Sequence, residues 1–246
     1  GLRYLALDQA GRCFGSKAVE TLLNPHHLRK HLATDNQQQQ PTIPLFALSI
    51  GGAYLLRDAD ASKLIAALSP TLQSLAWKAC PLLGLEMCKA ISSVFGQPKH
   101  TLLEFSLEDM TLSRESWEAL AGQKDDKPAA SSNSSSGWQC NLKSLSLKRV
   151  MGLQDDIVIS ILSGAPNLEH LDLSDNHELT DACFGPLRSI HAYSTLSSSP
   201  LRTLHLSNLK QLSSIGLVTL FTHGLEGMGP PPQLKVLSLN HLDAQA

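Results

Sequence analysis

The chain has 246 residues, of which 42% are hydrophobic and 17% are charged, and its formal net charge is −2. A charge this close to zero leaves no bulk basic surface, so composition does not indicate a nucleic-acid binder. The five cysteines form no Cys-x-x-Cys pair, and the sequence has neither a signal peptide nor an apolar run of membrane-spanning length. These features favour a reduced intracellular compartment, with no membrane attachment, over secretion.

One short pattern, Leu-x-x-Leu-x-Leu with single apolar replacements, recurs from one end of the chain to the other. Its copies begin at Leu2, Leu45, Leu72, Leu102, Leu142, Leu168, Leu201 and Leu234. Successive copies start 43, 27, 30, 40, 26, 33 and 33 residues apart. The shorter intervals are typical of leucine-rich repeats, and the longer ones indicate the same unit with insertions.

Within each unit, the leucine pattern predicts a short strand and the residues that follow predict a helix. The three apolar side chains of the pattern point inward, and the intervening residues face solvent. Good helix N-cap residue types recur 11–13 positions after the first leucine, namely Asp58, Ser113, Asp155, Thr180 and Ser213. Apolar residues follow at helical spacing, among them Leu64 and Leu68, Ile157 and Ile161, and Ile215, Leu217, Leu220 and Phe221. The expected fold is therefore an α/β leucine-rich-repeat solenoid (horseshoe) of about eight repeats, with a parallel sheet on the concave face and helices on the convex face.

Residues 1–246 are expected to form a single leucine-rich-repeat domain. Four stretches of low apolar content, 24–41, 123–137, 194–199 and 225–232, are expected to be mobile insertions. Neither end of the chain supplies the polar cap that a solenoid needs, which indicates a piece of a longer protein. The first insertion holds His26, His27 and His31 around Arg29-Lys30, which could bind a metal or phosphate, but a solvated loop is the favoured interpretation.

The ninth position of such a unit normally carries Cys or Asn, whose side chain satisfies backbone groups inside the turn. The residues at this position are Ala10, Ala53, Cys80, Met110, Val150, Asn176, Leu209 and Leu242. Only Cys80 and Asn176 follow the rule, so we expect neighbouring turns to satisfy their backbones in different ways.

Motifs for catalysis are missing from the sequence. It contains no phosphate-binding P-loop, no Gly-x-Ser-x-Gly and no His-Glu-x-x-His. Cys80 and Cys88 are interpreted as core residues, and the pair Asp155 and Asp156 as helix-start residues. We therefore expect a protein that is not an enzyme and that binds no cofactor and no metal.

The residues between the inward leucines form the concave face, which leucine-rich repeats usually present to partners. The fifth positions are mostly small, namely Ala6, Ser49, Ala76, Ser106, Ser146, Asp172, His205 and Ser238. A stripe of mixed charge in the C-terminal half also includes Asp175, Lys235 and His241. The candidate partner-binding residues are Lys143, Lys148, Arg149, Glu169, His170, Asp172, Arg202 and His205. Mixed signs favour a protein partner over a nucleic acid, and the alternative is a merely solvated face.

Three segments carry a more specific resemblance. Leu2–Phe14 contains Gly11-Arg12-Cys13, Leu45–Leu68 contains Gly52-Ala53-Tyr54 followed by Leu56 and Asp58, and Leu72–Leu83 follows in the same order. Together with Leu201–Leu217, they resemble the leucine-rich-repeat subunit of global-genome nucleotide excision repair, a radiation-sensitivity protein in yeast with plant and algal relatives. The similarity covers about a third of the chain, and the long insertions are not part of the shared pattern.

This resemblance implies a nuclear adaptor that works with a Swi/Snf-type repair ATPase and with a cullin-type ubiquitin ligase, without binding nucleic acid directly. It implies no catalytic or ligand residues. The remaining repeats match the cysteine-containing class found in F-box proteins, so substrate recognition in an F-box (SCF-type) ubiquitin ligase outside repair is the alternative. Without the resemblance, the expected location is cytoplasmic.

Overall fold

The computed structural model describes residues 2–23, 45–97, 100–122, 138–185, 201–222 and 234–240. The chain has an α/β fold built on an eight-stranded parallel sheet, whose strands lie side by side in the order in which they occur in the chain. These strands are β1 (Tyr4–Leu7), β3 (Ala47–Gly51), β5 (Ser74–Lys78), β6 (Glu104–Thr111), β7 (Ser144–Met151), β8 (His170–Asp172), β9 (Thr203–His205) and β10 (Val236–Ser238). The four predicted insertions lie outside the described residues.

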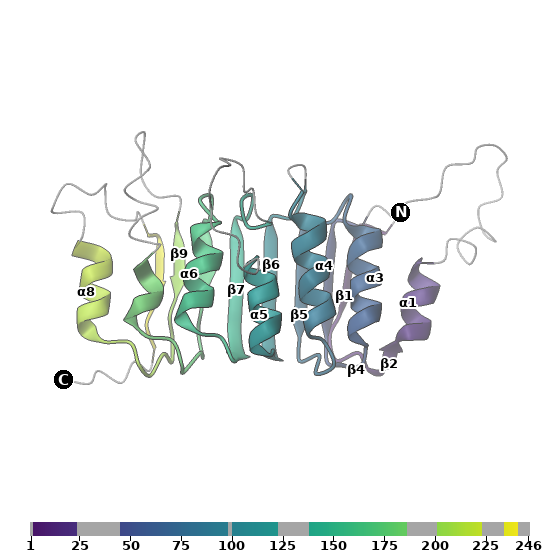
Figure 1. The fold of residues 1–246 in the computed structure, drawn as a ribbon, viewed down its shortest axis with the longest axis horizontal. Helices are drawn as coiled ribbons and strands as arrows, with labels where there is room; N and C mark the ends of the chain where they lie inside the picture. Colours follow the sequence, from purple (N-terminus) through teal and green to yellow (C-terminus); the bar gives the residue numbers. More distant parts are fainter. Residues whose placement is uncertain are drawn as a thin grey trace.

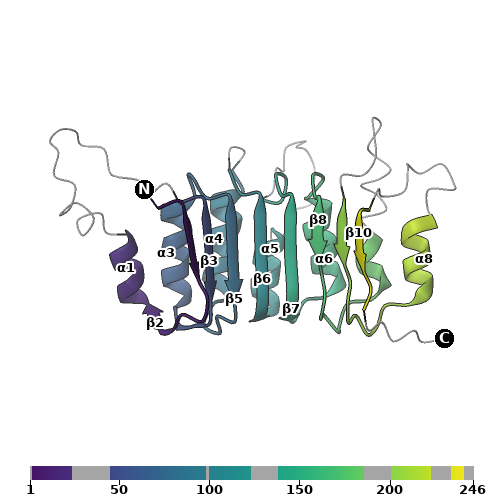
Figure 2. The same cartoon turned by 180° about the vertical axis from the view of Figure 1, so that it is seen from behind.

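In the described part of the chain, helices cover one face of this sheet and none lies on the opposite face (Figures 1 and 2). The helices are α1 (Ser16–Leu23), α3 (Asp58–Leu68), α4 (Leu85–Phe95), α5 (Arg114–Ala121), α6 (Asp155–Ser163), the 3-10 helix η1 (Asp181–Phe184) and α8 (Ser214–Thr222). A second, two-stranded sheet pairs β2 (Gly11–Gly15) with β4 (Ala53–Leu55). The predicted alternation of strand and helix is therefore confirmed in the described residues, with η1 a 3-10 helix where an α-helix was expected.

The leucines of the repeated pattern form continuous rows across the sheet. The middle leucines are in register from strand to strand, in the order Leu5, Leu48, Leu75, Phe105, Leu145, Leu171, Leu204 and Leu237. From Leu48 to Leu204 they are all buried, and Trp77 is fully buried in a leucine position of the next row. Burying one such side chain stabilises the fold by about 1.5–3 kcal/mol, so the rows together make a large contribution to the stability of the fold. The predicted inward positions are confirmed for these strands.

Some apolar side chains that were expected to face the core are exposed at the two edges of the sheet and on the last helix. Leu2 is 49% exposed and Leu237 is 41% exposed, because each edge strand has a neighbour on one side only. The expectation that Ile215 faces the core is wrong, since its side chain is 75% exposed on α8. Helical spacing selects a face of the helix, but it does not show how much of that face the neighbouring unit covers.

A left-handed residue lies near the C-terminal end of the strand in seven units. Backbone φ is positive at Gln9, Gly52, Ala79, Asp109, Arg149, Asp175 and Asn208, with values from 48° to 65°. Each of them follows the first leucine of its unit by seven positions. Asp and Asn tolerate this conformation, whereas Ala79 and Arg149 adopt it at a cost of about 1–3 kcal/mol.

Replacing Ala79 by glycine should therefore raise the free energy of unfolding by about 0.5–1 kcal/mol, because glycine has no Cβ to strain the left-handed backbone. The matched control is Ala76→Gly, three residues earlier in the extended strand β5, where the same change should cost about 0.5–1 kcal/mol. Chemical denaturation of both variants measures the difference. Shifts of the same sign in the two variants would contradict the assigned backbone conformation.

Side chains at the ninth position join neighbouring turns. The buried amide of Asn176 accepts from Val150 N at 2.9 Å and donates to Leu147 O at 2.5 Å and Leu173 O at 2.7 Å. Cys80 joins its own unit to the preceding one in a similar way. Its thiol donates to Ile50 O in the preceding unit at 3.6 Å and to Lys78 O in its own unit at 3.3 Å. The predicted roles of both residues are confirmed.

One further ninth position takes part in this network, and the sequence did not predict it. The thioether of Met110 accepts from Cys80 N at 3.3 Å, as the Asn176 oxygen accepts from Val150 N in a later unit. A thioether sulfur is a weak acceptor, which explains why residue type alone gave no signal at Met110.

Three of the five predicted N-caps are confirmed. Ser113 Oγ accepts from Ser116 N, Thr180 Oγ1 accepts from Ala182 N, and Ser213 Oγ accepts from Gly216 N. The predictions for Asp58 and Asp155 are wrong, because both lie one residue inside their helices.

The two misassigned aspartates instead serve the start of the next helix along the chain. Asp58 accepts from the backbone N–H groups of Gly84, Glu86 and Met87 at 2.8–3.0 Å, at the start of α4. Asp155 accepts from Thr180 N at 2.9 Å and from the Thr180 hydroxyl. A carboxylate at a helix N-terminus satisfies free N–H groups and complements the helix dipole. These aspartates therefore join neighbouring helices.

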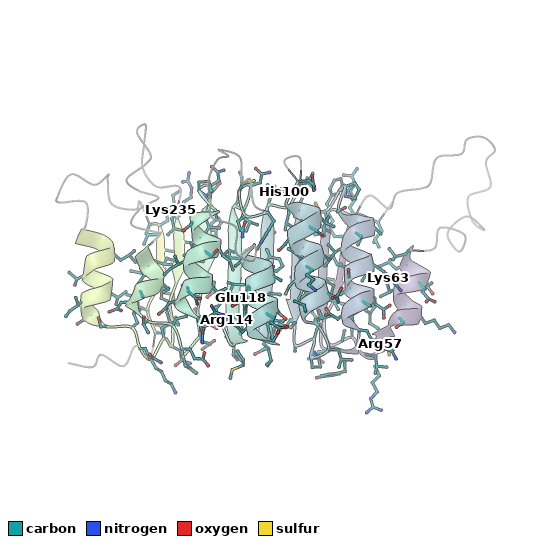
Figure 3. All side chains as sticks on the ribbon, viewed as in Figure 1. Arg57, Lys63, His100, Arg114, Glu118 and Lys235 are labelled. Atoms are coloured by element: carbon teal, nitrogen blue, oxygen red, sulfur yellow. The ribbon has the colours of Figure 1, made fainter. Side chains whose placement is uncertain are left out.

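Arg114 joins α5 to α6 on the outer side of the helices. Its guanidinium pairs with Glu118 on its own helix at 2.7 Å (Figure 3) and with Asp156 at the start of α6. The hydrogen bond from Arg114 lowers the pKa of Asp156, and the same bond raises the pKa of Arg114. All three side chains are about half exposed to solvent, so the pairs contribute about 0–1 kcal/mol each.

Candidate partner-binding face of the sheet

The face of the eight-stranded sheet that carries no helix is called the open face here, and it is seen in Figure 2. Its central row consists of the fifth residues of the units, which the strand pairing places side by side. They are, from β1 to β10, Ala6, Ser49, Ala76, Ser106, Ser146, Asp172, His205 and Ser238. The predicted row is confirmed, and over β3 to β7 it contains small uncharged side chains alone.

The row of third residues runs parallel to the central row, nearer to the strand starts. Its members are Tyr4, Ala47, Ser74, Glu104, Ser144, His170, Thr203 and Val236. His170 therefore pairs with Thr203, and two residues further along the same strands Asp172 pairs with His205. Asp172 Oδ1 accepts from Ser174 N at 2.9 Å, which fixes its carboxylate at the end of β8. Polar groups able to form directed hydrogen bonds thus gather over β8 and β9.

Charged side chains line the open face at the strand ends. Glu108 on β6 lies between Lys78, at 3.0 Å, and Lys148, at 4.0 Å. One position later, Arg149 lies between Asp109, at 3.1 Å, and Asp175, at 3.6 Å. The hydrogen bond from Lys78 to the Glu108 carboxylate, together with the negative charge of Glu108, raises the pKa of Lys78. Residues 78, 108, 148, 109, 149 and 175 are called the end rows.

A second group of charges lines the strand starts. Glu169 lies between Lys143, whose Nζ is 3.4 Å from Oε1, and Arg202, whose Nε is 3.5 Å from Oε2. The backbone hydrogen bonds from Glu169 N to Lys143 O and from Arg202 N to Glu169 O place the three residues in sequence across the sheet. These three residues are called the start row. In both groups a side chain of one charge lies between two side chains of the opposite charge. The ion pairs therefore orient charged groups that remain in contact with solvent.

All eight predicted partner-binding residues belong to these rows. Lys143, Glu169 and Arg202 form the start row, Lys148 and Arg149 belong to the end rows, and His170, Asp172 and His205 lie between them. Asp175 belongs to the end rows, Lys235 is exposed next to Arg202, and His241 lies outside the described residues. The eight residues thus lie together on the open face, and binding by them stays a prediction.

Three members of the end rows were missed by the sequence analysis, namely Lys78, Glu108 and Asp109. Each occupies the same offset within its unit as Lys148 or Arg149, six or seven positions after the first leucine. That offset was the available signal, and it extends the charged surface from β7 back to β5.

Within the described ranges, no three His, Cys, Asp or Glu side chains come together in a way that could hold a metal ion. The candidate histidines of the first insertion lie outside them. None of the described helices has both the length and the apolar character needed to cross a bilayer.

The chain has structural similarity to solved proteins, but no match at the level of sequence families. No protein-family model matches the chain, and no curated protein matches it. Among solved structures, the chain is similar to one described as "Crystal structure of Rad7 and Elc1 complex in yeast", with 16% sequence identity and a TM-score of 0.39. The match covers 92% of this chain and 62% of the other, so this chain spans less than two thirds of the matched protein.

Proposed function

We propose that the chain is a leucine-rich-repeat solenoid of about eight units that binds another protein through its open face and catalyses no reaction. The observation that carries this proposal is the arrangement of the open face, a row of small side chains bordered by oriented ion pairs. Small side chains let a partner approach the sheet, and charges already held in place lose little freedom when they meet a complementary surface.

A protein partner fits this surface better than a nucleic acid does. In the start row and end rows, five positive side chains alternate with four negative ones, and Asp172 adds a further carboxylate. A nucleic-acid site needs a continuous basic surface that replaces phosphate counterions. Here each acidic side chain of the rows would lie against a phosphate and weaken such binding.

The proposed setting is nuclear DNA repair, with a Swi/Snf-type repair ATPase and a cullin-type ubiquitin ligase as partners. It rests on the sequence motifs at Gly11–Cys13 and Gly52–Asp58 and on the repeat at Leu201–Leu217. Substrate recognition in an F-box ubiquitin ligase outside repair is the second candidate, favoured by the buried Cys80 in the ninth position of its unit. The identity of proteins captured from nuclear extract separates the two.

Substituting Ser146 by arginine is expected to weaken partner capture at least about tenfold, because a long charged side chain would stand in the middle of the small central row. The matched control is Ser163→Arg, the same change on the exposed last turn of α6, on the helix-covered side. Both variants should melt within a few degrees of the native chain, because neither site is in the core. Quantitative pull-down from nuclear extract with each variant measures the effect.

Equal capture by the two arginine variants would rule out the open face as the binding surface. A separate measurement tests the class of partner. The chain should bind damaged and undamaged DNA duplexes no more tightly than the usual non-specific range, about 10⁻⁴–10⁻⁶ M at physiological salt. Sub-micromolar binding to either duplex would overturn the protein-scaffold proposal.

A further inference from the structure

A cysteine and a histidine from neighbouring units meet at the strand-start edge of the sheet. Cys140, which precedes β7, places its Sγ 3.4 Å from Nε2 of His100, which precedes β6. Asn141 donates from Nδ2 to the backbone oxygen of His100 at 3.2 Å, and Asn167 donates to the backbone oxygen of Cys140 at 2.9 Å. Both members of the pair are therefore held by a neighbouring amide side chain. Figure 3 marks His100 at this edge.

The surroundings of His100 determine its protonation. Its ring packs edge-on against Phe95, and Nδ1 is buried with no hydrogen-bond partner in the described part of the chain. Burial lowers the pKa of His100, so the imidazole is neutral near pH 7. The Asn141 amide nitrogen, a donor, also lies 3.5 Å from Nε2. Nε2 therefore faces two donors, the amide and the thiol, and is the nitrogen that accepts.

The other cysteines lie in different environments. Cys80, Cys88 and Cys183 are buried, and burial raises the pKa of Cys80 and raises that of Cys88 to about 12. Cys13 is exposed, and no side chain of the described residues hydrogen-bonds to its sulfur. Cys140 is half-buried, and its sulfur contacts an imidazole. A thiol with both access and a neighbouring base has the features of a reactive cysteine.

We propose that Cys140 is a redox modification site, at which His100 acts as the base that activates the thiol toward hydrogen peroxide. The imidazole Nε2 takes the thiol proton as sulfur attacks one peroxide oxygen. A sulfur–oxygen bond forms, the oxygen–oxygen bond breaks, and the departing hydroxide takes the proton to leave as water. Sulfur is oxidised by two electrons to a sulfenic acid and peroxide is reduced, so the step needs no other reactant. This activity is independent of the open face.

The five cysteines allow the test to be made within one sample. The purified chain is treated with hydrogen peroxide, sulfenic acid is trapped with dimedone, and each cysteine is quantified by peptide mass spectrometry. Cys140 should be trapped faster than Cys13 by on the order of tenfold near pH 7. In His100→Gln, which retains the backbone oxygen that Asn141 binds, the ratio of the two rates should fall to about one. Cys80, Cys88 and Cys183 should stay unmodified while the fold is intact, and they report on it directly.

A second measurement uses the native chain alone. Between about pH 5 and about pH 9, the rate at Cys140 should rise at a lower pH than the rate at Cys13, because the base that activates it is already neutral there. The proposal is overturned if Cys140 reacts no faster than Cys13 across this range. It is also overturned if the ratio is unchanged in His100→Gln while the three buried cysteines remain protected. Should that variant expose the buried cysteines, the pH profile of the native chain decides.

Discussion

Replacing Leu171 by aspartate is expected to lower the free energy of unfolding by about 3–5 kcal/mol. Leu171 is 1% exposed and lies in register between Leu145 and Leu204 in the buried middle row. A carboxylate at this point would lose its hydration, and the side chains on either side are apolar. The destabilisation should appear in chemical denaturation as a lower midpoint. It should become smaller as the pH is lowered, because the carboxyl group is then protonated and the neutral form is less costly to bury.

The matched control is the adjacent residue of the same strand. His170→Ala removes a side chain that is exposed on the open face, so its effect should be about 0.5 kcal/mol or less. A one-residue change of register would exchange the faces of these two side chains. Equal losses of stability in Leu171→Asp and His170→Ala would falsify the register of β8.

The rows of the sheet were predictable because each depends on a fixed position within a repeated unit. The fifth position of the unit, four residues after the first leucine, predicted that Ser146 and Asp172 would be neighbours, and their pairing is observed. Trp77 occupies a leucine position of its unit and is fully buried for the same reason. Identical units stacked in order bring identical positions together, so a local pattern determines these long-range contacts.

Contacts that join different positions of neighbouring units were not predictable in this way. Asp58 was assigned to its own helix, but its carboxylate reaches backbone N–H groups 26 to 29 residues later. Nothing in the residues around Asp58 distinguishes a cap of its own helix from a cap of the next one, since both use the same side chain. The choice depends on the distance between adjacent helices, which packing determines.

The pairing of His100 with Cys140 was hidden for a different reason. The two residues are 40 positions apart, and the predicted insertion 123–137 lies between them. Both lie two residues before the first leucine of their units, so the repeat does place them at the same edge. Aligning the units on their first leucines shows that the two residues share a position. Looking for a base close to each cysteine in the sequence does not reveal the pair, because the two residues are far apart along the chain.

Substituting Asn176 by leucine is expected to cost on the order of 3 kcal/mol, although leucine is close to asparagine in volume and is apolar in a buried position. The change removes one acceptor and two donors, and it leaves Val150 N, Leu147 O and Leu173 O without the partner they have in the native chain. Buried backbone groups that lose their hydrogen bonds cost about 1–3 kcal/mol each, and that cost outweighs the gain from burying an apolar side chain.

Two further variants show whether the hydrogen bonds or the shape of the side chain matters. Asn176→Cys should recover about half of the loss, because the thiol of Cys80 already donates to backbone oxygens at the ninth position of its own unit. Asn167→Leu makes the original change at an exposed residue that donates one hydrogen bond, and it should cost about 1 kcal/mol or less. Urea denaturation of the three proteins gives the comparison. A loss at Asn176→Leu no greater than that at Asn167→Leu would mean that the ninth position does not hold adjacent turns together, and that packing of the leucine rows alone joins them.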